Sequence, residues 1–262
     1  MQLDLKNKKA LVCGSTQGIG KAVAIELANL GANVVLMARN EESLKKVKGE
    51  LNTEKGQQHS YLVADFSNHS EVSEILSLYL SRQGNINIVV NNTGGPRAGL
   101  LTQAKPIEFL DAFQQHLVCN HLIAQACIEG MKRSGYGRII NIISTSVKQP
   151  LKGLGVSNTI RAAVANWSKT LANELGPFGI TVNNVLPGAT QTSRLNEIIQ
   201  NKSLKQNMET SAVQEEMLHE IPAGRFADPT EIAYAVAFLS SPSAAYINGI
   251  NLPVDGGRTS CL

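Results

Sequence analysis

The stretch Cys13–Gly20, "CGSTQGIG", decides the fold of the N-terminal part of the chain. It follows a short apolar run, "KALVC" (9–13), and opens a segment whose apolar residues recur at helical spacing. Three glycines, Gly14, Gly18 and Gly20, stand at this junction. Glycines in such a turn let the backbone approach a pyrophosphate, which the free N–H groups of the helix start then stabilise. The stretch therefore predicts a strand, a phosphate-binding turn and a helix.

The rest of the chain alternates between strand-like and helix-like segments. Continuous apolar, β-branched runs predict strands that are buried on both faces, at 9–15, 33–39, 60–66, 86–92, 137–144 and 179–187. Helical spacing predicts helices at 41–55, 68–83, 106–134 and 155–176. This alternation predicts a single α/β domain over residues 1–262, with a mostly parallel sheet covered by helices on both faces.

Composition and charge narrow the class of function. A hydrophobic content of 43% and a charged content of 17% are ordinary for a soluble globular protein. A net charge of +3, without a basic stripe, predicts no nucleic-acid partner, and no apolar run reaches membrane-spanning length. The four cysteines lack metal-binding spacing, so we expect no metal site and buried thiols in a reducing cytoplasm.

The segment 193–222 is polar and helical in pattern, between the last predicted strand and a C-terminal helix. Two interpretations remain open on its length alone. It is either a mobile lid over a substrate site or a plain surface helical hairpin.

Three further motifs accompany the glycine turn. They are "NNTG" (91–94), a PGxxxT pattern at Pro187, Gly188 and Thr192, and a C-terminal segment, 221–257, that ends in "VDGG". With the GxxxGxG spacing of the turn they span nearly the whole chain in a fixed order. In this set of motifs the chain resembles the short-chain dehydrogenase/reductase family, and in particular its 3-oxoacyl-thioester reductases.

The resemblance implies a fold, an assembly and a class of substrate. The fold is one doubly wound Rossmann domain with a seven-stranded sheet in the order 3-2-1-4-5-6-7. Long helices at 106–134 and 155–176, with the C-terminal segment, resemble the surfaces through which family members pair, so a homotetramer is expected. The substrate is expected to be a small molecule or an acyl compound.

The end of the second predicted strand indicates the choice of cofactor. An adenosine ribose with a free 2′-hydroxyl is usually met by a carboxylate there, whereas a 2′-phosphate is met by a cation. This strand ends at Arg39, whose guanidinium can fork onto phosphate oxygens, so NADP(H) is predicted. Gln17, where many NADP-preferring relatives have a cation, and the nearby Glu41 and Glu42 weigh against it.

The candidate cofactor contacts follow from the glycine turn and from the family motifs. They are Gly14, Ser15, Gln17, Gly18, Ile19, Gly20, Arg39, Asp65, Phe66, Asn91, Gly94, Arg161, Pro187, Gly188, Thr190 and Thr192.

The catalytic set that the resemblance implies is an asparagine, a serine, a tyrosine and a lysine. Spacing places Ser144 on the serine, but the tyrosine position holds Ser157 and the lysine position holds Arg161. The asparagine position falls on His116, with Asn120 one helical turn later. The usual proton donor to a carbonyl is therefore missing, and general acid catalysis is typically worth about 10²–10⁴ in rate.

Other residues are candidates to compensate for the missing tyrosine. His116 titrates near neutrality and is a candidate acid, or else a structural helix histidine. Arg161 is a candidate to clamp a carboxylate or a developing enolate. Ser157 and Asn158 are candidates for catalysis or for simple capping of a helix start.

Loop cations complete the set of candidates. Arg97, Lys148 and Lys152 are candidate contacts for an acidic substrate, although solvated surface charges are the plainer interpretation.

Two functions remain open from the sequence. The first is an NADP(H)-dependent reductase that transfers a hydride to a carbonyl or a conjugated enone and handles the proton in a non-standard way. The second is a catalytically silent NADP(H)-binding protein that acts as a sensor or as a partner subunit.

Overall fold

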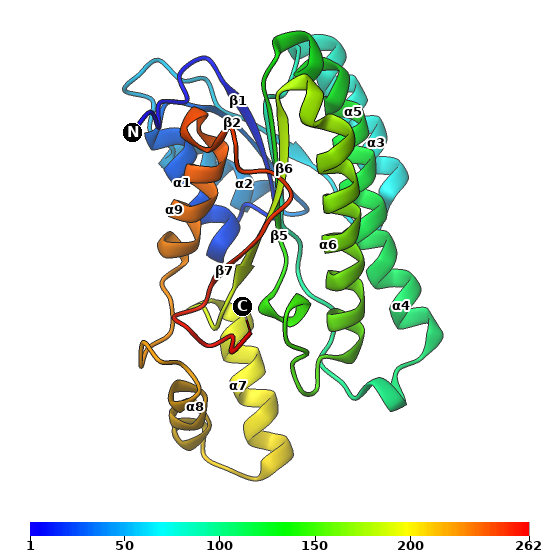
Figure 1. Ribbon diagram of the computed structural model, residues 1–262, viewed down its shortest axis with the longest axis vertical. Helices are drawn as coiled ribbons and strands as arrows, with labels where there is room; N and C mark the ends of the chain where they lie inside the picture. Colours follow the sequence, from blue (N-terminus) through cyan, green and yellow to red (C-terminus); the bar gives the residue numbers. More distant parts are fainter. Residues whose placement is uncertain (262) are drawn as a thin grey trace.

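The computed structural model describes residues 1–261 and is built on one seven-stranded sheet (Figure 1). The strands are β1 (Lys9–Cys13), β2 (Asn33–Ala38), β3 (Ser60–Val63), β4 (Ile88–Asn91), β5 (Gly137–Ile142), β6 (Ile180–Pro187) and β7 (Asn251–Val254). All neighbouring strands pair in parallel, in the order β3-β2-β1-β4-β5-β6-β7. The predicted fold class and strand order are confirmed.

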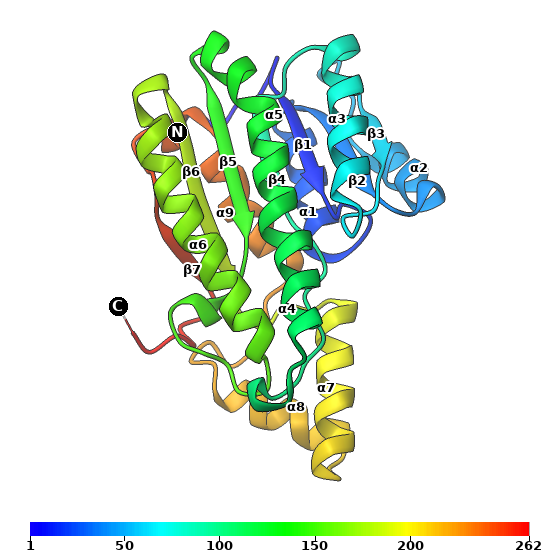
Figure 2. The same cartoon turned by 90° about the vertical axis from the view of Figure 1, so that its right-hand side faces the viewer.

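Helices cover both faces of the sheet, as continuous apolar strands require. One layer consists of α1 (Gly18–Asn29), α2 (Glu41–Glu50) and α9 (Pro229–Ser240). The opposite layer, which faces the viewer in Figure 2, consists of α3 (His69–Gln83), α5 (Cys119–Ser134) and α6 (Gly155–Leu175). All residues of β4 and β5 are buried between these layers. Among residues 1–261, no helix has the length and apolarity needed to cross a membrane.

The helix predicted at 106–134 is present over these residues, but it contains a π-helical turn that the sequence did not predict. The chain forms α4 (Pro106–Phe113), then a π-helical turn at Gln114–Val118, then α5. A π turn accommodates one extra residue per turn and so rotates the side chains that precede it relative to those that follow. The turn contains His116, whose side chain is buried and pairs with a residue of the loop after β4.

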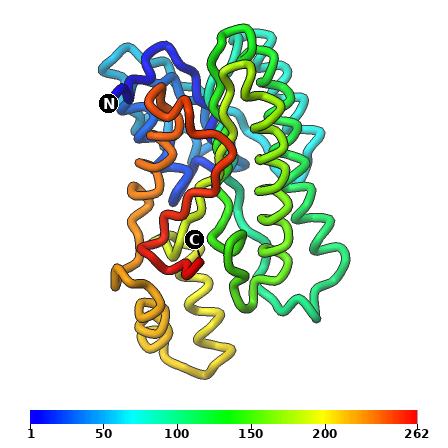
Figure 3. The backbone as a smooth tube through the Cα atoms, in the orientation of Figure 1, coloured from blue at the N-terminus to red at the C-terminus, as the bar shows by residue number. Residues whose placement is uncertain are grey.

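The segment 193–222 forms two helices, α7 (Ser193–Gln206) and α8 (Thr210–His219). Asn207 reverses the chain between them in a left-handed conformation, with a φ of 51°. The hairpin has a small core of its own, and it projects beyond the carboxyl ends of the strands (Figure 1), so that it forms one end of the molecule (Figure 3). The core residues are Leu195, Ile199, Val213 and Met217.

A chain of buried amides fixes α6 against the sheet. Asn91, Asn141, Asn184 and Asn251 are register partners on β4 to β7, and their side chains hydrogen bond to one another at 2.8, 3.0 and 2.8 Å. Ser168 of α6 accepts from Asn141 Nδ2 and donates to Asn184 Oδ1, both at 2.8 Å. Side chains that are hydrogen-bonded in a buried network specify one arrangement of the elements that they join. The ladder therefore fixes α6 at Ser168, in the C-terminal half of that helix, against β5 and β6.

Candidate active site

The turn between β1 and α1 has the backbone geometry that a phosphate site needs. Gly14 and Gly18 adopt positive φ angles of 57° and 52°, which glycine accepts without a steric cost. A Cβ on Gly20 would lie 2.1 Å from the carbonyl oxygen of Gly14, so only glycine fits there. Gln17, the N-cap of α1, makes no side-chain bond to the helix start. The first N–H groups of α1 are therefore available to an anion.

Asn92 braces this turn and was missed by the sequence reasoning. Its Nδ2 donates to the carbonyl oxygens of Cys13 and Gly14, at 3.3 and 3.2 Å. The second asparagine of "NNTG" was the available signal, but the sequence does not say which strand end its side chain meets.

Two candidate cofactor residues use their side chains elsewhere. Ser15 is fully buried, and its Oγ accepts from the backbone N–H of Met37 at 3.1 Å. Asn91 spends its amide on the ladder across the sheet. The hydroxyl of Ser15 thus links the turn after β1 to β2, and the amide nitrogen of Asn91 links β4 to β5.

The end of β2 presents one exposed cation. The side chain of Arg39 is 75% exposed, and its Nη1 lies 3.9 Å from Asp65 Oδ2. Hydrogen bonding from the backbone of Ser67 and, more weakly, the charge of Arg39 keep the pKa of Asp65 below its usual value. Phe66 follows, half-buried, with its carbonyl oxygen accepting from Cys119 Sγ at 3.2 Å. Arg39 is thus free to reach a phosphate at this end of the cleft.

The loop after β6 lies against the glycine turn. Thr192 caps α7 by accepting from Leu195 N–H, and its Cγ2 would lie 3.1 Å from a Cβ on Gly18. Gly188 packs so closely on Asp255 that a Cβ would fall 2.7 Å from its Cα. Pro187 ends β6, and the hydroxyl of the buried Thr190 donates to the carbonyl of Gly188. The PGxxxT segment therefore borders the phosphate turn.

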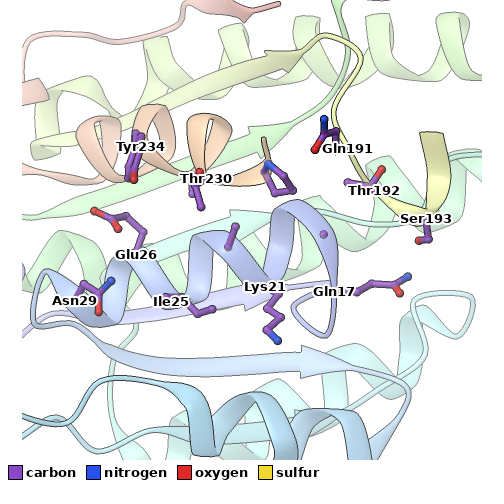
Figure 4. Close-up of a pocket in the computed structure, with 14 residues that line it drawn as sticks. Gln17, Lys21, Ile25, Glu26, Asn29, Gln191, Thr192, Ser193, Thr230 and Tyr234 are labelled. Carbon is purple, nitrogen blue, oxygen red and sulfur yellow. The ribbon is translucent and has the colours of Figure 1, made fainter. Parts of the chain in front are cut away.

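A groove of about 530 Å³ runs from this border along α1 and α9 (Figure 4). Gln17, Thr192 and Ser193 lie at one end, and Asn29 and Tyr234 lie at the other. No candidate catalytic residue lines the groove. The candidate catalytic residues instead lie around the ends of β4 and β5, where His116 meets Thr93 and Arg161 meets Ile142.

Arg161 is the charged group at the centre of these candidate catalytic residues. It lies in the first two turns of α6, is only 8% exposed, and its Nη1 donates to the carbonyl of Ile142, two residues before Ser144. It forms no ion pair with an acidic side chain within residues 1–261. Burial, with the nearby charge of Arg194, lowers the pKa of Arg161 to about 10. An arginine keeps its proton even so, and it acts as a fixed positive charge.

His116 is a neutral group in the folded protein. It is 1% exposed, and its Nδ1 shares a hydrogen bond with Thr93 Oγ1 at 2.6 Å. Burial, with the charge of Arg161, lowers the pKa of His116 to about 2. Nε2 is buried and has no hydrogen-bond partner among residues 1–261. The imidazole is therefore not the imidazolium that a general acid would need near neutral pH.

Ser144 and Ser157 are the candidate catalytic serines. Ser144 follows β5, and its Oγ accepts from the backbone N–H of Ser146 at 3.1 Å, which leaves its own proton available to a ligand. Ser157 is half-buried one turn before Arg161. The helix cap is Leu154, so Ser157 and Asn158 are not N-caps.

The other sequence candidates are more dispersed. The amide of Asn158 donates to the carbonyl of Leu151, Asn120 is buried in α5, and Arg97 and Lys152 are exposed. Lys148, half-buried, ends the short turn after Ser144.

Arg194 was missed by the sequence reasoning. It is the second residue of α7, and its Nη2 donates to the carbonyl of Pro96 at 2.7 Å. A Cβ built on Gly95 would lie 3.8 Å from Arg161 Nη2 and 4.0 Å from Arg194 Nη2. The fold thus brings together two guanidinium groups from helices far apart in the sequence.

This arrangement agrees with the comparisons with known proteins. A family model described as enoyl-(acyl carrier protein) reductase matches residues 14–259. The chain belongs to the short-chain dehydrogenase/reductase family. The 3-oxoacyl-[acyl-carrier-protein] reductase FabG of Vibrio cholerae is 35% identical over 257 residues, which cover 97% of this chain and 98% of that protein.

Other members of the family extend the likeness. The NADPH-dependent reductase BacG of Bacillus subtilis is 29% identical, over 98% of this chain and 100% of that protein. The crystal structure of L-sorbose reductase from Gluconobacter frateurii, complexed with NADPH and L-sorbose, superposes with a TM-score of 0.93 at 28% identity and covers 100% of both chains. The chain is thus an oxidoreductase of the short-chain dehydrogenase/reductase family.

Proposed function

We propose that this short-chain reductase uses NADP(H) and reduces conjugated enones in preference to isolated ketones. The observation that carries the proposal is that a buried Arg161, without an acidic partner among residues 1–261, acts beside a His116 that is held neutral. The site thus offers a fixed positive charge for an anion and no ready acid for an oxygen.

The residues present fit the cofactor. Gly14, Gly18 and Gly20 form a turn that only glycines can make, and the start of α1 is open to the pyrophosphate. Arg39 is exposed at the end of β2, where a 2′-phosphate would be met. NADP(H) is therefore the cofactor that these groups suit, and several structural relatives are named with NADPH.

The carbonyl oxygen of the substrate is the atom on which the chain's own residues act. Bound NADPH supplies the hydride. When the β-carbon of an enone accepts it, the carbon–carbon double bond breaks and the negative charge moves to the carbonyl oxygen. The N–H groups of Arg161 and the hydroxyl of Ser144 stabilise this enolate without giving up a proton. Solvent water then protonates the α-carbon, and the product is the saturated ketone.

An isolated ketone makes a different demand on the same residues. Its reduction leaves an alkoxide that needs a proton on oxygen, which the missing tyrosine would supply. His116, with a pKa of about 2, does not carry that proton, and the hydroxyl of Ser157 is a weak acid. Ketone reduction by His116 acting as acid is therefore the less favoured form of the proposal.

The alternative is an NADP(H)-binding protein without turnover. The loss of the tyrosine favours it, and the retained Ser144 and Thr192 weigh against it, because binding alone has little need of them. Incubation with NADPH and either 2-cyclohexenone or cyclohexanone separates the two functions, with products identified by NMR. We expect cyclohexanone from the enone. Reduction of the ketone at an equal rate, or the allylic alcohol as product, would contradict enone selectivity. NADPH binding without any oxidation would support the silent binder.

The helical hairpin and an exposed apolar surface belong to the same proposal. We infer that α7 and α8 act as a lid, because Arg194 ties α7 to the loop after β4.

We also infer a homotetramer in which α4 meets a second copy, since Ile107, Leu110 and Phe113 are 55%, 58% and 42% exposed. Light scattering that gives a monomeric mass would contradict the assembly.

A further inference from the structure

The loops that form the substrate half of the cleft carry charges of one sign. The loops after β4 and β5, residues 92–105 and 143–158, contain no aspartate or glutamate. The short loop after β6, residues 188–192, has no acidic residue either. The cations in the two longer loops are Arg97, Lys105, Lys148 and Lys152.

These loops are joined into one rim. The backbone N–H of Gly99 donates to the carbonyl of Gly153 at 2.7 Å, and Gly155 donates back to Gly99 at 3.2 Å. Lys152, next to Gly153 in the sequence, is thereby kept beside the loop that holds Gly95 and Arg97. The acidic residues at the strand ends lie elsewhere, after β3 and β7 (Asp65 and Asp255).

Arg161 and Arg194 face the same small space inside this rim. Their Nη2 atoms both lie within 4.0 Å of the point where a side chain on Gly95 would begin. Because Gly95 has no side chain, the space between the two guanidinium groups is not filled by that residue. The side chain of Arg194 is 38% exposed, whereas Arg161 is 8% exposed.

The two charges are incompletely compensated by the chain itself. Arg161 has no acidic partner within residues 1–261, and Arg194 is paired at 3.2 Å with Glu197, which lies on the exposed face of α7. Cations that are buried in proteins are normally paired, and like charges held close together repel. An anion between the two groups would neutralise both, and a planar carboxylate matches the fork of a guanidinium.

We propose that Arg194 and Arg161 bind a carboxylate group of the substrate, so that this enzyme favours enones that carry a free carboxylate over neutral enones and acyl thioesters. The proposal rests on the proposed function for the reaction that follows binding. It adds that Arg194 is a specificity-determining residue and that the carboxylate draws α7 towards the loop after β4.

Equilibrium binding tests the site without any need for turnover. The probes are levulinate and benzoate, each against its methyl ester, and the N-acetylcysteamine thioester of levulinate. They are titrated by calorimetry into the protein saturated with NADP⁺. We expect saturable binding of at least one carboxylate, at least about tenfold tighter than its ester, and a loss of about tenfold or more in Arg194→Gln. Ester binding should not change in that variant.

Matched variants separate charge from structure. Arg82→Gln removes the same charge at the last turn of α3 and should leave carboxylate binding unchanged. Arg194→Lys keeps a cation and should retain part of the affinity. Glu197→Gln frees Arg194 of its acidic neighbour and should strengthen binding. If Arg194→Gln instead weakens ester and acid alike, Arg194 is only a tether for α7 and the proposal fails.

The remaining outcomes are decisive as well. Equal affinity for acid and ester, or no binding of either carboxylate, overturns the carboxylate site even if the protein reduces neutral enones. Tighter binding of inorganic phosphate than of either carboxylate, lost in Arg194→Gln, overturns the choice of a carboxylate. Arginine-dependent carboxylate binding in a protein that never oxidises NADPH would leave the site standing and remove the reductase.

Discussion

The nucleotide half of the cleft, over β1 to β3, and the substrate half, over β4 to β6, use different parts of the chain. The nucleotide half depends on backbone shape, with Gly14 and Gly18 at positive φ and Gly20 in contact with the carbonyl of Gly14. The substrate half depends on side chains, and there the predicted correspondence places Ser157 and Arg161 at the positions of the family's tyrosine and lysine. A substitution in the glycine turn forces the backbone to move, whereas a side chain above the strand ends can be replaced without moving the backbone.

Substitution of Gly20 by alanine should have a large effect, and it is confined to the nucleotide half. The new Cβ would lie 2.1 Å from the carbonyl oxygen of Gly14, so the turn must open. We expect NADPH affinity to fall by about 100-fold or more, which is roughly 2.7 kcal/mol. Fluorescence titration measures it. Gly49→Ala in α2, where a Cβ meets nothing within 4 Å, is the matched control and should leave affinity unchanged.

Substitution of Arg161 by glutamine tests the substrate half. Loss of the buried charge should lower the rate of NADPH oxidation by enones about 10²–10³-fold, the usual effect of removing an oxyanion donor. NADPH affinity should change by less than about tenfold, because the phosphate turn is intact. Arg161→Lys, which keeps the charge, should retain more activity. Equal rates in wild type and Arg161→Gln would remove Arg161 from the reaction.

Substitution of Arg39 by glutamine tests the cofactor preference of the nucleotide half. Its exposed guanidinium meets a 2′-phosphate by charge-assisted hydrogen bonds, so NADPH affinity should fall by about tenfold and NADH affinity should not. Competitive titration of both cofactors measures the ratio, with Arg82→Gln as control. An unchanged ratio, or tighter binding of NADH by the wild type, would contradict the assignment of Arg39.

Substitution of His116 by asparagine should have little effect on enone reduction but a clear effect on acid stability. Burial and then Arg161 lower the pKa of His116 from 6.5 to about 2, so between these values the unfolded chain binds a proton that the folded protein does not. The free energy of unfolding therefore falls as the pH falls through this window, by up to about 1.4 kcal/mol per pH unit. Between pH 7 and pH 5 the wild type should lose about 2 kcal/mol more than His116→Asn in urea denaturation.

Kinetic measurements on the same variant test the opposite hypothesis, in which His116 is the general acid. If His116 were the acid, His116→Asn would abolish turnover and the wild-type rate would show an inflection between pH 5 and pH 8. Either observation would contradict a neutral, structural imidazole.

The architecture was predictable because it depends on regular patterns. Buried parallel strands form continuous apolar runs in the sequence, and the glycine turn follows from steric limits, so the strands and the conformation of the turn were predictable. The π turn at Gln114–Val118 was not, since one extra residue in a helix leaves the hydrophobic pattern almost unaltered. Its presence explains how His116, expected on a simple helix face, is buried against Thr93.

The substrate side was predictable only in part because its contacts join distant segments. The sequence pointed to Arg161 as a clamp, but the approach of Arg194 from α7 and the brace from Asn92 depend on where loops meet in space. The acidity of His116 could not be predicted either, since a pKa follows from burial and from neighbouring charge rather than from residue type. Of the two roles that the sequence left open for His116, the lowered pKa favours the structural one.

Single-turnover oxidation of NADPH tests most directly the claim that an intact hydride site operates with altered proton handling. Stopped-flow traces compare wild type with Ser157→Tyr/Arg161→Lys on a matched enone and ketone. We predict that the wild type reduces the enone alone, and that the double variant gains ketone reduction. Fast ketone reduction by the wild type would contradict the account, and silence on every substrate despite tight NADPH binding would make the protein a cofactor binder.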